Sequence, residues 1–139
     1  MDLSVIIVPY KCKDDLDVTL EAVFASQTKY SYEVIIIDND SQDGTTEMVQ
    51  EKYMSRPELT GRLTYQLNTN EGFGKGNNRG MKIAKGDYFL LLNPDTKVDP
   101  DNIEVMMDFI KSRSDVGIAT CKLIRPDGKL DPASRRDRP

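Results

Sequence analysis

Short runs of apolar, β-branched residues alternate along this chain with segments of helical periodicity, and this alternation limits the fold more than any other feature. The run at residues 3–8, LSVIIV, is typical of a strand that is covered on both faces. Residues 14–27 follow, with apolar residues at i, i+4, i+7 and i+8 counted from Leu16, which indicates a helix with one buried face.

The same alternation continues to the end of the chain. We expect further strands at residues 33–37, 63–67, 88–92 and 116–123, helices at 45–54 and near 81–84, and a hairpin turn at 126–128. Asp99 is expected to cap another helix, with Pro100 in its first turn. Residues 68–80 are expected to form a glycine-rich and asparagine-rich loop. Five strands with intervening helices predict an α/β fold with a doubly wound, mostly parallel sheet in one domain.

Composition excludes several classes of function. The chain has no histidine, which removes His-based catalytic triads and most zinc sites. Its two cysteines, Cys12 and Cys121, match no metal-ligand spacing. The net charge of −4 does not favour nucleic-acid binding. No apolar run approaches the roughly 20 residues of a membrane span, so we expect a cytoplasmic location, with or without peripheral association at the inner face of the membrane.

Polar or aromatic clusters follow three of the predicted strands directly. They are Val8-Pro9-Tyr10, Asp38-Asn39-Asp40 and Asn93-Pro94-Asp95. Turn chemistry alone explains any one of them, because Asp, Asn and Pro are common where a strand stops. In a doubly wound sheet, however, ligands bind beyond the carboxyl ends of the strands, where the strand order reverses. Three clusters on one rim therefore indicate a ligand site.

Each cluster suggests its own chemistry. Asp95 is a lone carboxylate beside a proline, and Mg²⁺ or Mn²⁺ often takes only one or two protein carboxylates when phosphates and water complete its shell. Such a metal would neutralise charge on a departing phosphate. Asp38 could accept a hydrogen bond from a base or a ribose hydroxyl. Tyr10 could stack on a base, or equally be a core aromatic with one edge in solvent.

The glycine-rich segment NEGFGKGNNRG, residues 70–80, contains neither a P-loop pattern nor GxGxxG directly after a strand. Its backbone could approach a phosphate or a base closely, with Asn77 and Asn78 donating amide hydrogens. A flexible surface loop, whose glycines only make turns, is the alternative.

Five blocks of the sequence resemble, in order, those of family 2 glycosyltransferases: SVIIVPYK, VIIIDNDSQDGT, NEGFGKGNNRG, GDYFLLLNPDT and DGKLDPASRRDRP. The pattern is most similar to the rhamnosyltransferase-like branch. The resemblance implies a GT-A fold and an inverting transfer of a sugar from a nucleoside diphosphate to an acceptor hydroxyl, in polysaccharide or cell-surface glycan synthesis. It also implies a divalent cation (Mg²⁺ or Mn²⁺) that bridges the diphosphate.

The resemblance also assigns roles to residues. Val8 and Tyr10 match the block that frames the nucleobase and ribose, and Asp38 matches the carboxylate that bonds the base. Asn77 stands where many relatives have arginine, and Asn93 stands where the metal-binding block usually has its first aspartate; Asp95 matches the last acidic residue of that block. The nucleotide-sugar-binding residues implied are Val8, Pro9, Tyr10, Asp38, Asp40, Gly74, Lys75, Asn77, Asn78, Asn93 and Asp95, with Asp95 as the metal ligand.

One expected part has no match in the sequence. Inverting transfer needs a general base, which in the family lies downstream of the metal block, and Asp127 and Asp131 stand in a hairpin context instead. We therefore expect residues 1–139 to be the donor-binding half of a GT-A domain, incomplete at the C-terminus and inactive alone. Its expected partners are a UDP-, dTDP- or GDP-linked sugar and a glycan or lipid-linked acceptor. A non-catalytic nucleotide- or partner-binding module and a nucleotidyltransferase are the alternatives.

Overall fold

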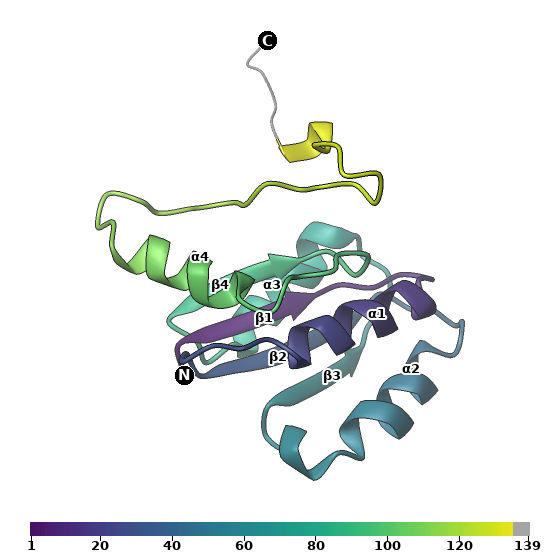
Figure 1. The fold of residues 1–139 in the computed structure, drawn as a ribbon. Coiled ribbons are helices and arrows are strands. Elements are labelled where there is room, and N and C mark those ends of the chain that lie inside the picture. The colour runs from purple at the N-terminus through teal and green to yellow at the C-terminus, as the bar shows by residue number, and fades with distance from the viewer. Residues whose placement is uncertain (135–139) are drawn as a thin grey trace.

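The computed structural model describes residues 1–134, which form a parallel sheet with helices on both faces (Figure 1). The strands are β1 (Leu3–Ile7), β2 (Tyr32–Asp38), β3 (Leu63–Leu67) and β4 (Tyr88–Leu92). The helices are α1 (Lys13–Phe24), α2 (Thr45–Met48), α3 (Phe73–Ile83) and α4 (Asn102–Lys111). A π-helical turn η1 (Val49–Met54) continues α2, and the 3₁₀ turns are η2 (Pro57–Leu59) and η3 (Pro132–Ser134).

The order of the strands confirms the doubly wound α/β prediction. The sheet runs β3-β2-β1-β4, and all three pairings are parallel. The chain moves outward from β1 to β3 and then returns to place β4 on the other side of β1, so the order reverses between β1 and β4. In sheets of this kind the ligand crevice lies at that switch point, beyond the carboxyl ends of the strands.

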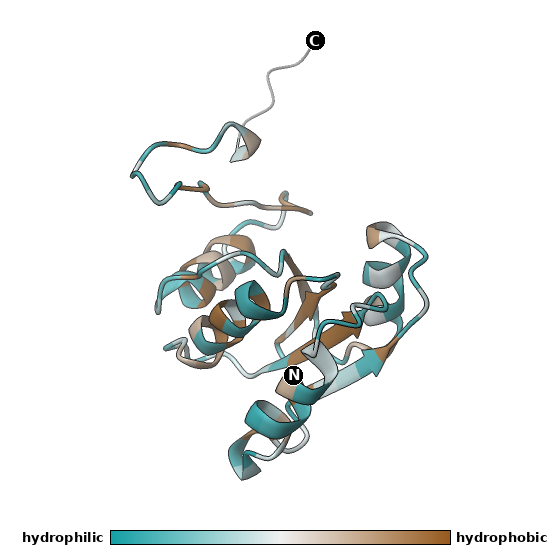
Figure 2. Cartoon of the chain, turned by 90° about the vertical axis from the view of Figure 1, so that its right-hand side faces the viewer, coloured by the Kyte–Doolittle hydropathy of each residue, from teal (hydrophilic) through white to brown (hydrophobic). Residues whose placement is uncertain are grey.

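Two layers of helices cover the sheet. Alternate residues of β1 and β2 pack against α1, η1 and α4 in the larger core, which includes Leu20, Tyr53 and Met107. The opposite face carries a smaller cluster in which Ile6, Val8, Ile35 and Ile37 pack against α3. Hydrophobic residues are correspondingly concentrated on the strands (Figure 2). β1 and β2 are buried along their whole length and, apart from Ser4, Glu33 and Asp38, are apolar on both faces, because each face has its own helical cover.

Helix α3 lies so close to β1 that two of its positions have no room for a side chain. A Cβ on Gly76 would lie 2.6 Å from Val8 Cγ1, and one on Gly80 would lie 2.4 Å from Ile6 Cγ2. The prediction of a loop over residues 68–80 is therefore wrong from Phe73 onward, and the helix begins well before the predicted residue 81. Close packing against the sheet outweighs the low helix propensity of glycine.

Two further predictions are wrong. Residues 116–123 form no strand: Ile118 is 93% exposed, and they have no ladder partner within the described chain. Apolar periodicity marks a segment able to form a strand, but a strand also needs a neighbour. The turn that follows is confirmed, since Ile124 and Leu130 form an antiparallel bridge around it. Asp99 does not cap α4, which begins at Asn102; the Asn102 N–H donates to the Asp99 carbonyl oxygen instead.

A buried polar pair secures the start of β4 against the sheet. The Ser4 hydroxyl donates to Glu33 Oε1 (2.7 Å), and both residues are at most 2% exposed. The same carboxylate oxygen accepts the Lys85 N–H (2.7 Å), and Ser4 Oγ accepts the Gly86 N–H (2.9 Å). A Cβ on Gly86 would meet the Ser4 backbone nitrogen at 2.5 Å, so the chain passes here without a side chain.

Replacing Ser4 with alanine tests this anchor. Ser4→Ala deprives a buried carboxylate of one donor and a partly buried N–H, that of Gly86, of its acceptor, and we expect it to lower the free energy of unfolding by about 2–3 kcal/mol. Urea denaturation measures the change. Ser31→Ala, which removes an exposed hydroxyl bonded to the Asp2 carboxylate at 2.7 Å, is the control and should cost less than about 1 kcal/mol. Equal losses in the two variants would contradict the role given to Ser4.

Candidate functional site

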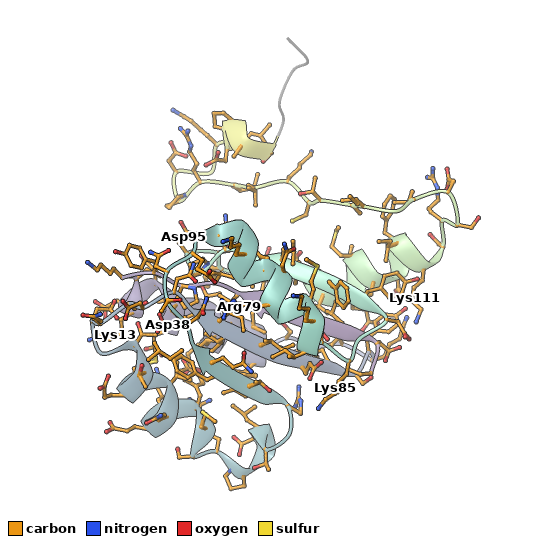
Figure 3. All side chains as sticks on the ribbon, turned by 180° about the vertical axis from the view of Figure 1, so that it is seen from behind. Lys13, Asp38, Arg79, Lys85, Asp95 and Lys111 are labelled. Carbon is orange, nitrogen blue, oxygen red and sulfur yellow. The ribbon has the colours of Figure 1, made fainter. Side chains whose placement is uncertain are left out.

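The three polar clusters meet at one end of the sheet. The strand register pairs Ile7 with both Ile36 and Leu92, so Pro9, Asp38 and Pro94 lie at the same level, each two residues further along its strand. Asp38, Asp95 and Lys13 gather at this end of the molecule, whereas Lys85 and Lys111 lie at the other (Figure 3). The predicted rim therefore exists, and it coincides with the switch point between β1 and β4.

Asp38 is turned into the protein at this rim. Its side chain is 1% exposed. One carboxylate oxygen accepts the backbone N–H (2.9 Å) and the hydroxyl (2.6 Å) of Ser41, and the other accepts the hydroxyl of Tyr65 on β3 (2.6 Å). In this arrangement the carboxylate braces the turn that follows β2. A direct contact between Asp38 and a base stays a prediction, and the structure gives both oxygens protein donors.

Tyr65 is the partner of Asp38 that the sequence did not indicate. Burial, and then the hydrogen bond to Asp38, raise the pKa of its hydroxyl well above the usual range, so it stays a donor at any physiological pH. Its oxygen also lies 2.7 Å from Thr46 Oγ1. Since Tyr65 donates to the carboxylate, Thr46 is the donor of that second bond. The chain Thr46–Tyr65–Asp38 joins α2, β3 and the end of β2.

The loop after β1 is held against the loop after β2. The Asn39 N–H donates to the Pro9 carbonyl (3.0 Å), and the Lys11 N–H donates to Ser41 Oγ (3.1 Å). Lys11, Asp40 and Gln42 all have positive φ angles, of 51°, 64° and 50°. Non-glycine residues hold such angles only where their surroundings enforce them, and these cases cluster at functional sites.

Asp43 ties the same turn to the helices. Its carboxylate accepts the N–H and hydroxyl of Thr45 at 3.1 and 2.6 Å, and the N–H of Lys13 at 3.1 Å. Burial acts to raise the pKa of Asp43, but these hydrogen bonds outweigh it and leave the pKa lowered. The carboxylate is therefore ionised at neutral pH and joins the starts of α1 and α2.

Residues 93–96 make a turn that presents Asp95 to solvent. The Thr96 N–H donates to the Asn93 carbonyl (3.2 Å), and the buried Thr19 hydroxyl of α1 donates to the Pro94 carbonyl (2.7 Å). Asn93 and Asp95 are both exposed. Burial raises the pKa of the Cys12 thiol, and the carboxylates of Asp43, Asp15 and Asp95 raise it further.

Residues 1–134 contain no group of three or more acidic or cysteine side chains placed to hold a metal by themselves. Asp95 and Asn93 together offer two exposed oxygen-bearing side chains on one turn. That set fits a Mg²⁺ or Mn²⁺ ion whose remaining ligands come from phosphate oxygens and water. It does not fit a metal held by protein alone.

The first turns of α3 carry the residues predicted from the glycine-rich segment. Gly74, Lys75 and Asn78 are exposed, and Lys75 pairs with Glu71 at 3.6 Å. Asn77 is 4% exposed; its amide nitrogen donates to the Phe73 carbonyl (3.1 Å), and its Oδ1 has no donor within residues 1–134. A buried acceptor without a donor is costly, and Asn77 Oδ1 is the one buried side-chain acceptor of residues 1–134 that lacks a donor.

Tyr10 and the other members of the β1 cluster separate into exposed and buried positions. Tyr10 is 49% exposed, with Lys11 Nζ 5.3 Å from its ring centre. Val8 and Pro9 are buried. A free aromatic face at the rim fits the predicted stacking role for Tyr10, whereas Val8 forms part of the contact between β1 and α3.

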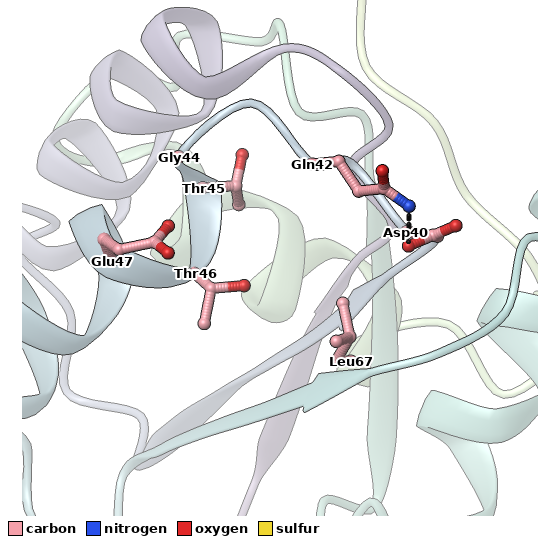
Figure 4. Close-up of a pocket in the computed structure, with 7 residues that line it drawn as sticks. All are labelled: Asp40, Gln42, Gly44, Thr45, Thr46, Glu47 and Leu67. Atoms are coloured by element: carbon pink, nitrogen blue, oxygen red, sulfur yellow. Dashed lines mark hydrogen bonds between the residues drawn. The ribbon is translucent and has the colours of Figure 1, made fainter.

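An open cavity of ≈ 360 Å³ lies beside the ends of β2 and β3 (Figure 4). It is lined by Asp40, Gln42, Gly44, Thr45, Thr46, Glu47 and Leu67. Gln42 donates to the Asp40 carboxylate (2.8 Å) within it. Two carboxylates at its edge, Asp40 and Glu47, oppose the binding of a phosphate group in this cavity.

Comparison with known proteins gives the class of the chain. Residues 4–138 match the family model for glycosyl transferase family 2, and the chain belongs to that family. The chain is 30% identical over 120 residues to the dolichol-phosphate mannosyltransferase of Pyrococcus furiosus, covering 86% of this chain and 33% of that protein. It is 29% identical over 117 residues to a chondroitin synthase of Escherichia coli, covering 84% of this chain and 16% of that protein. It thus spans a third or less of both relatives.

Solved structures give the fold. The mannosyltransferase PcManGT from Pyrobaculum calidifontis, in complex with GDP-Man and Mn²⁺, superposes with a TM-score of 0.71 at 21% identity, over 90% of this chain and 36% of that one. TarS of S. aureus superposes with a TM-score of 0.68 at 25% identity, over 81% of this chain and 20% of that one. The α/β sheet is accordingly that of GT-A glycosyltransferases. Within residues 1–134, no helix has the length and apolar character to cross a membrane.

Proposed function

We propose that this chain forms the nucleotide-sugar-binding part of a glycosyltransferase that moves a sugar from a nucleoside diphosphate to an acceptor hydroxyl. The observation that carries the proposal is the rim itself: an exposed carboxylate, an exposed aromatic ring and an unpaired buried acceptor meet at the switch point of a sheet whose chain belongs to this family. The inverting course of the transfer, and a role in polysaccharide or cell-surface glycan synthesis, are parts of the same proposal.

The geometry supports a specific placement of the donor. Gly76 of α3 lies on Val8, and Val8 follows Ile7, which pairs with Leu92. The first turns of α3 therefore lie beside the Asn93–Asp95 turn, and the diphosphate fits between them. Asp95, with Asn93 beside it, would hold a Mg²⁺ or Mn²⁺ ion, which neutralises charge on the leaving diphosphate when it is bound.

The remaining residues of the rim bind and orient the nucleoside in this proposal. Tyr10 stacks against the base, and Asn77 Oδ1 accepts a ligand N–H. Lys75 is exposed on the first turn of α3 and can supply a positive charge toward the phosphates in place of the arginine of many relatives, although it first has to leave Glu71. The structures of relatives bound to GDP-Man and UDP-GlcNAc support nucleotide sugars as the ligand class. We propose a glycan or lipid-linked acceptor and place no general base within residues 1–134.

A binding panel tests the proposal. We expect isothermal titration calorimetry with UDP-, dTDP- and GDP-sugars to show one nucleotide bound at least about tenfold more tightly with Mn²⁺ than with EDTA. ATP with Mn²⁺ is the control for non-specific binding of a phosphate–metal complex. Absence of binding by every nucleoside-diphosphate sugar, with metal present, would refute the donor-site proposal.

A further inference from the structure

We propose that Tyr65 is a positioning residue of the donor site, whose hydroxyl holds the Asp38 carboxylate and through it the wall formed by residues 38–44. This inference rests on the proposed function. It concerns a side chain on β3 that faces none of the residues assigned to the ligand, apart from Asp38, and that belongs to none of the sequence blocks of the family resemblance.

The first step is the bond itself. Tyr65 is the only donor to Asp38 Oδ2 within residues 1–134, at 2.6 Å, while Ser41 supplies both donors to Oδ1. The carboxylate is almost fully buried. Without the Tyr65 hydroxyl, one oxygen of a buried ionisable group has no partner, and the group has to rotate or admit water.

The second step leads from Asp38 to the loops. Ser41 Oγ, which donates to Asp38, is the acceptor for the Lys11 N–H of the loop after β1. The Asn68 N–H donates to the Asp38 carbonyl at 2.8 Å, which fixes the end of β3 to the same residue. A rotation of the Asp38 carboxylate therefore disturbs the loops after β1 and β2 together.

The third step concerns the stored strain in the wall. Asp40 and Gln42 keep positive φ angles beside Ser41, which is itself held by Asp38. Each such residue costs of order 1 kcal/mol or more, so the loop relaxes when its brace is weakened. Relaxation moves residues 38–44 relative to Tyr10. The space between this segment and Tyr10 is where the base enters in the proposed site, so its shape changes.

A second tyrosine, Tyr53, provides the control that distinguishes a positioning role in nucleotide binding from a contribution to stability alone. The Tyr53 hydroxyl also donates to a carboxylate, that of Asp17, and burial followed by that bond raises its pKa as for Tyr65. Its partners Asp17 and Glu21 lie on α1 and outside residues 38–44. Tyr53→Phe therefore removes a tyrosine–carboxylate hydrogen bond without touching the rim, at a carboxylate whose side chain is 32% exposed.

The experiment compares Tyr65→Phe with Tyr53→Phe by thermal unfolding and by calorimetric titration of GDP, UDP and dTDP with Mn²⁺. We expect both variants to lose a similar few degrees of Tm, about 2–5 °C. Tyr65→Phe should weaken binding of the preferred nucleotide about tenfold, while Tyr53→Phe stays within about twofold of the wild type. In a double-mutant cycle, Asp38→Asn with Tyr65→Phe should bind no more weakly than Asp38→Asn alone, because the tyrosine acts through that carboxylate.

The outcomes are distinct. If the wild type binds a nucleotide and Tyr65→Phe binds it equally well, or if both tyrosine variants lose affinity equally, the inference is overturned while the proposed function stands. If the wild type binds no nucleotide, the proposed function fails and takes this inference with it. Should Tyr65→Phe not fold, Thr46→Val removes the next bond in the chain: a loss of about threefold in affinity supports the inference, and unchanged affinity overturns it.

Discussion

Replacing Asp95 with alanine is expected to remove the metal-dependent part of nucleotide binding. The Asp95 side chain is exposed, so the fold should be unaffected by the substitution. In the proposed site it is the one charged protein ligand of the cation, and Asn93 alone is a weak substitute. Affinity for the preferred nucleoside diphosphate in Mn²⁺ should fall at least about tenfold, to the value measured in EDTA.

Asp99→Ala is the matched control, because it removes another exposed carboxylate from the same loop. It should leave both the affinity and its dependence on metal within about twofold of the wild type. Asp95→Asn removes the charge but keeps a side-chain oxygen. Its affinity for the nucleotide in Mn²⁺ should lie between the affinities of Asp95→Ala and Asp99→Ala. A variant without the Asp95 carboxylate that still binds nucleotide more tightly with Mn²⁺ would show that the metal ligand lies elsewhere.

Substitutions at two glycines of α3 are expected to change stability in opposite directions. Alanine at Gly80 would place its Cβ 2.4 Å from Ile6 Cγ2, whereas nothing lies within 4 Å of a Cβ on Gly74. Gly80→Ala should lower the free energy of unfolding by about 2–3 kcal/mol, because α3 has to move away from β1. Gly74→Ala should raise it by about 0.5–1 kcal/mol, since alanine has the higher helix propensity.

Urea denaturation with both variants in parallel measures these changes, and Tm should shift by about 3 °C for each kcal/mol. The two residues belong to one helix, so a general effect of alanine on α3 would move them the same way. Stability of Gly80→Ala equal to that of the wild type would mean that α3 packs further from β1 than the structure shows.

The parallel sheet and its rim were predictable because the decisive signals are local. Buried β-branched runs, such as residues 33–37, mark strands that helices cover on both faces, and polar residues directly after them mark where each strand ends. Since all carboxyl ends of parallel strands share one edge, the meeting of Tyr10, Asp38 and Asp95 followed without any knowledge of long-range contacts.

The remaining features depend on partners far away in the sequence. The early start of α3 is not predictable from the sequence, because closely spaced glycines favour a loop. The helix forms here because Gly76 and Gly80 pack against Val8 and Ile6, a contact that the sequence does not indicate. The strand expected at 116–123 failed because a strand needs a neighbour as well as a pattern. The inward orientation of Asp38 depends on Tyr65, which is 27 residues away and has no signature of its own.

The contact of α3 with β1 through Gly76 and Gly80 also bears on how such a protein can be re-engineered. The contact is made by backbone and leaves no side chain at those two positions to vary. In the proposed donor site, a graft of the segment 38–44 from a relative would test whether this segment sets donor preference. The segment is bonded to the loop after β1, to the start of α1 and to β3. Such a graft has to carry a matching residue at position 65, because the tyrosine there completes the hydrogen bonds of Asp38. The segment 38–44 and the strand residue Tyr65 would thus have to be exchanged together.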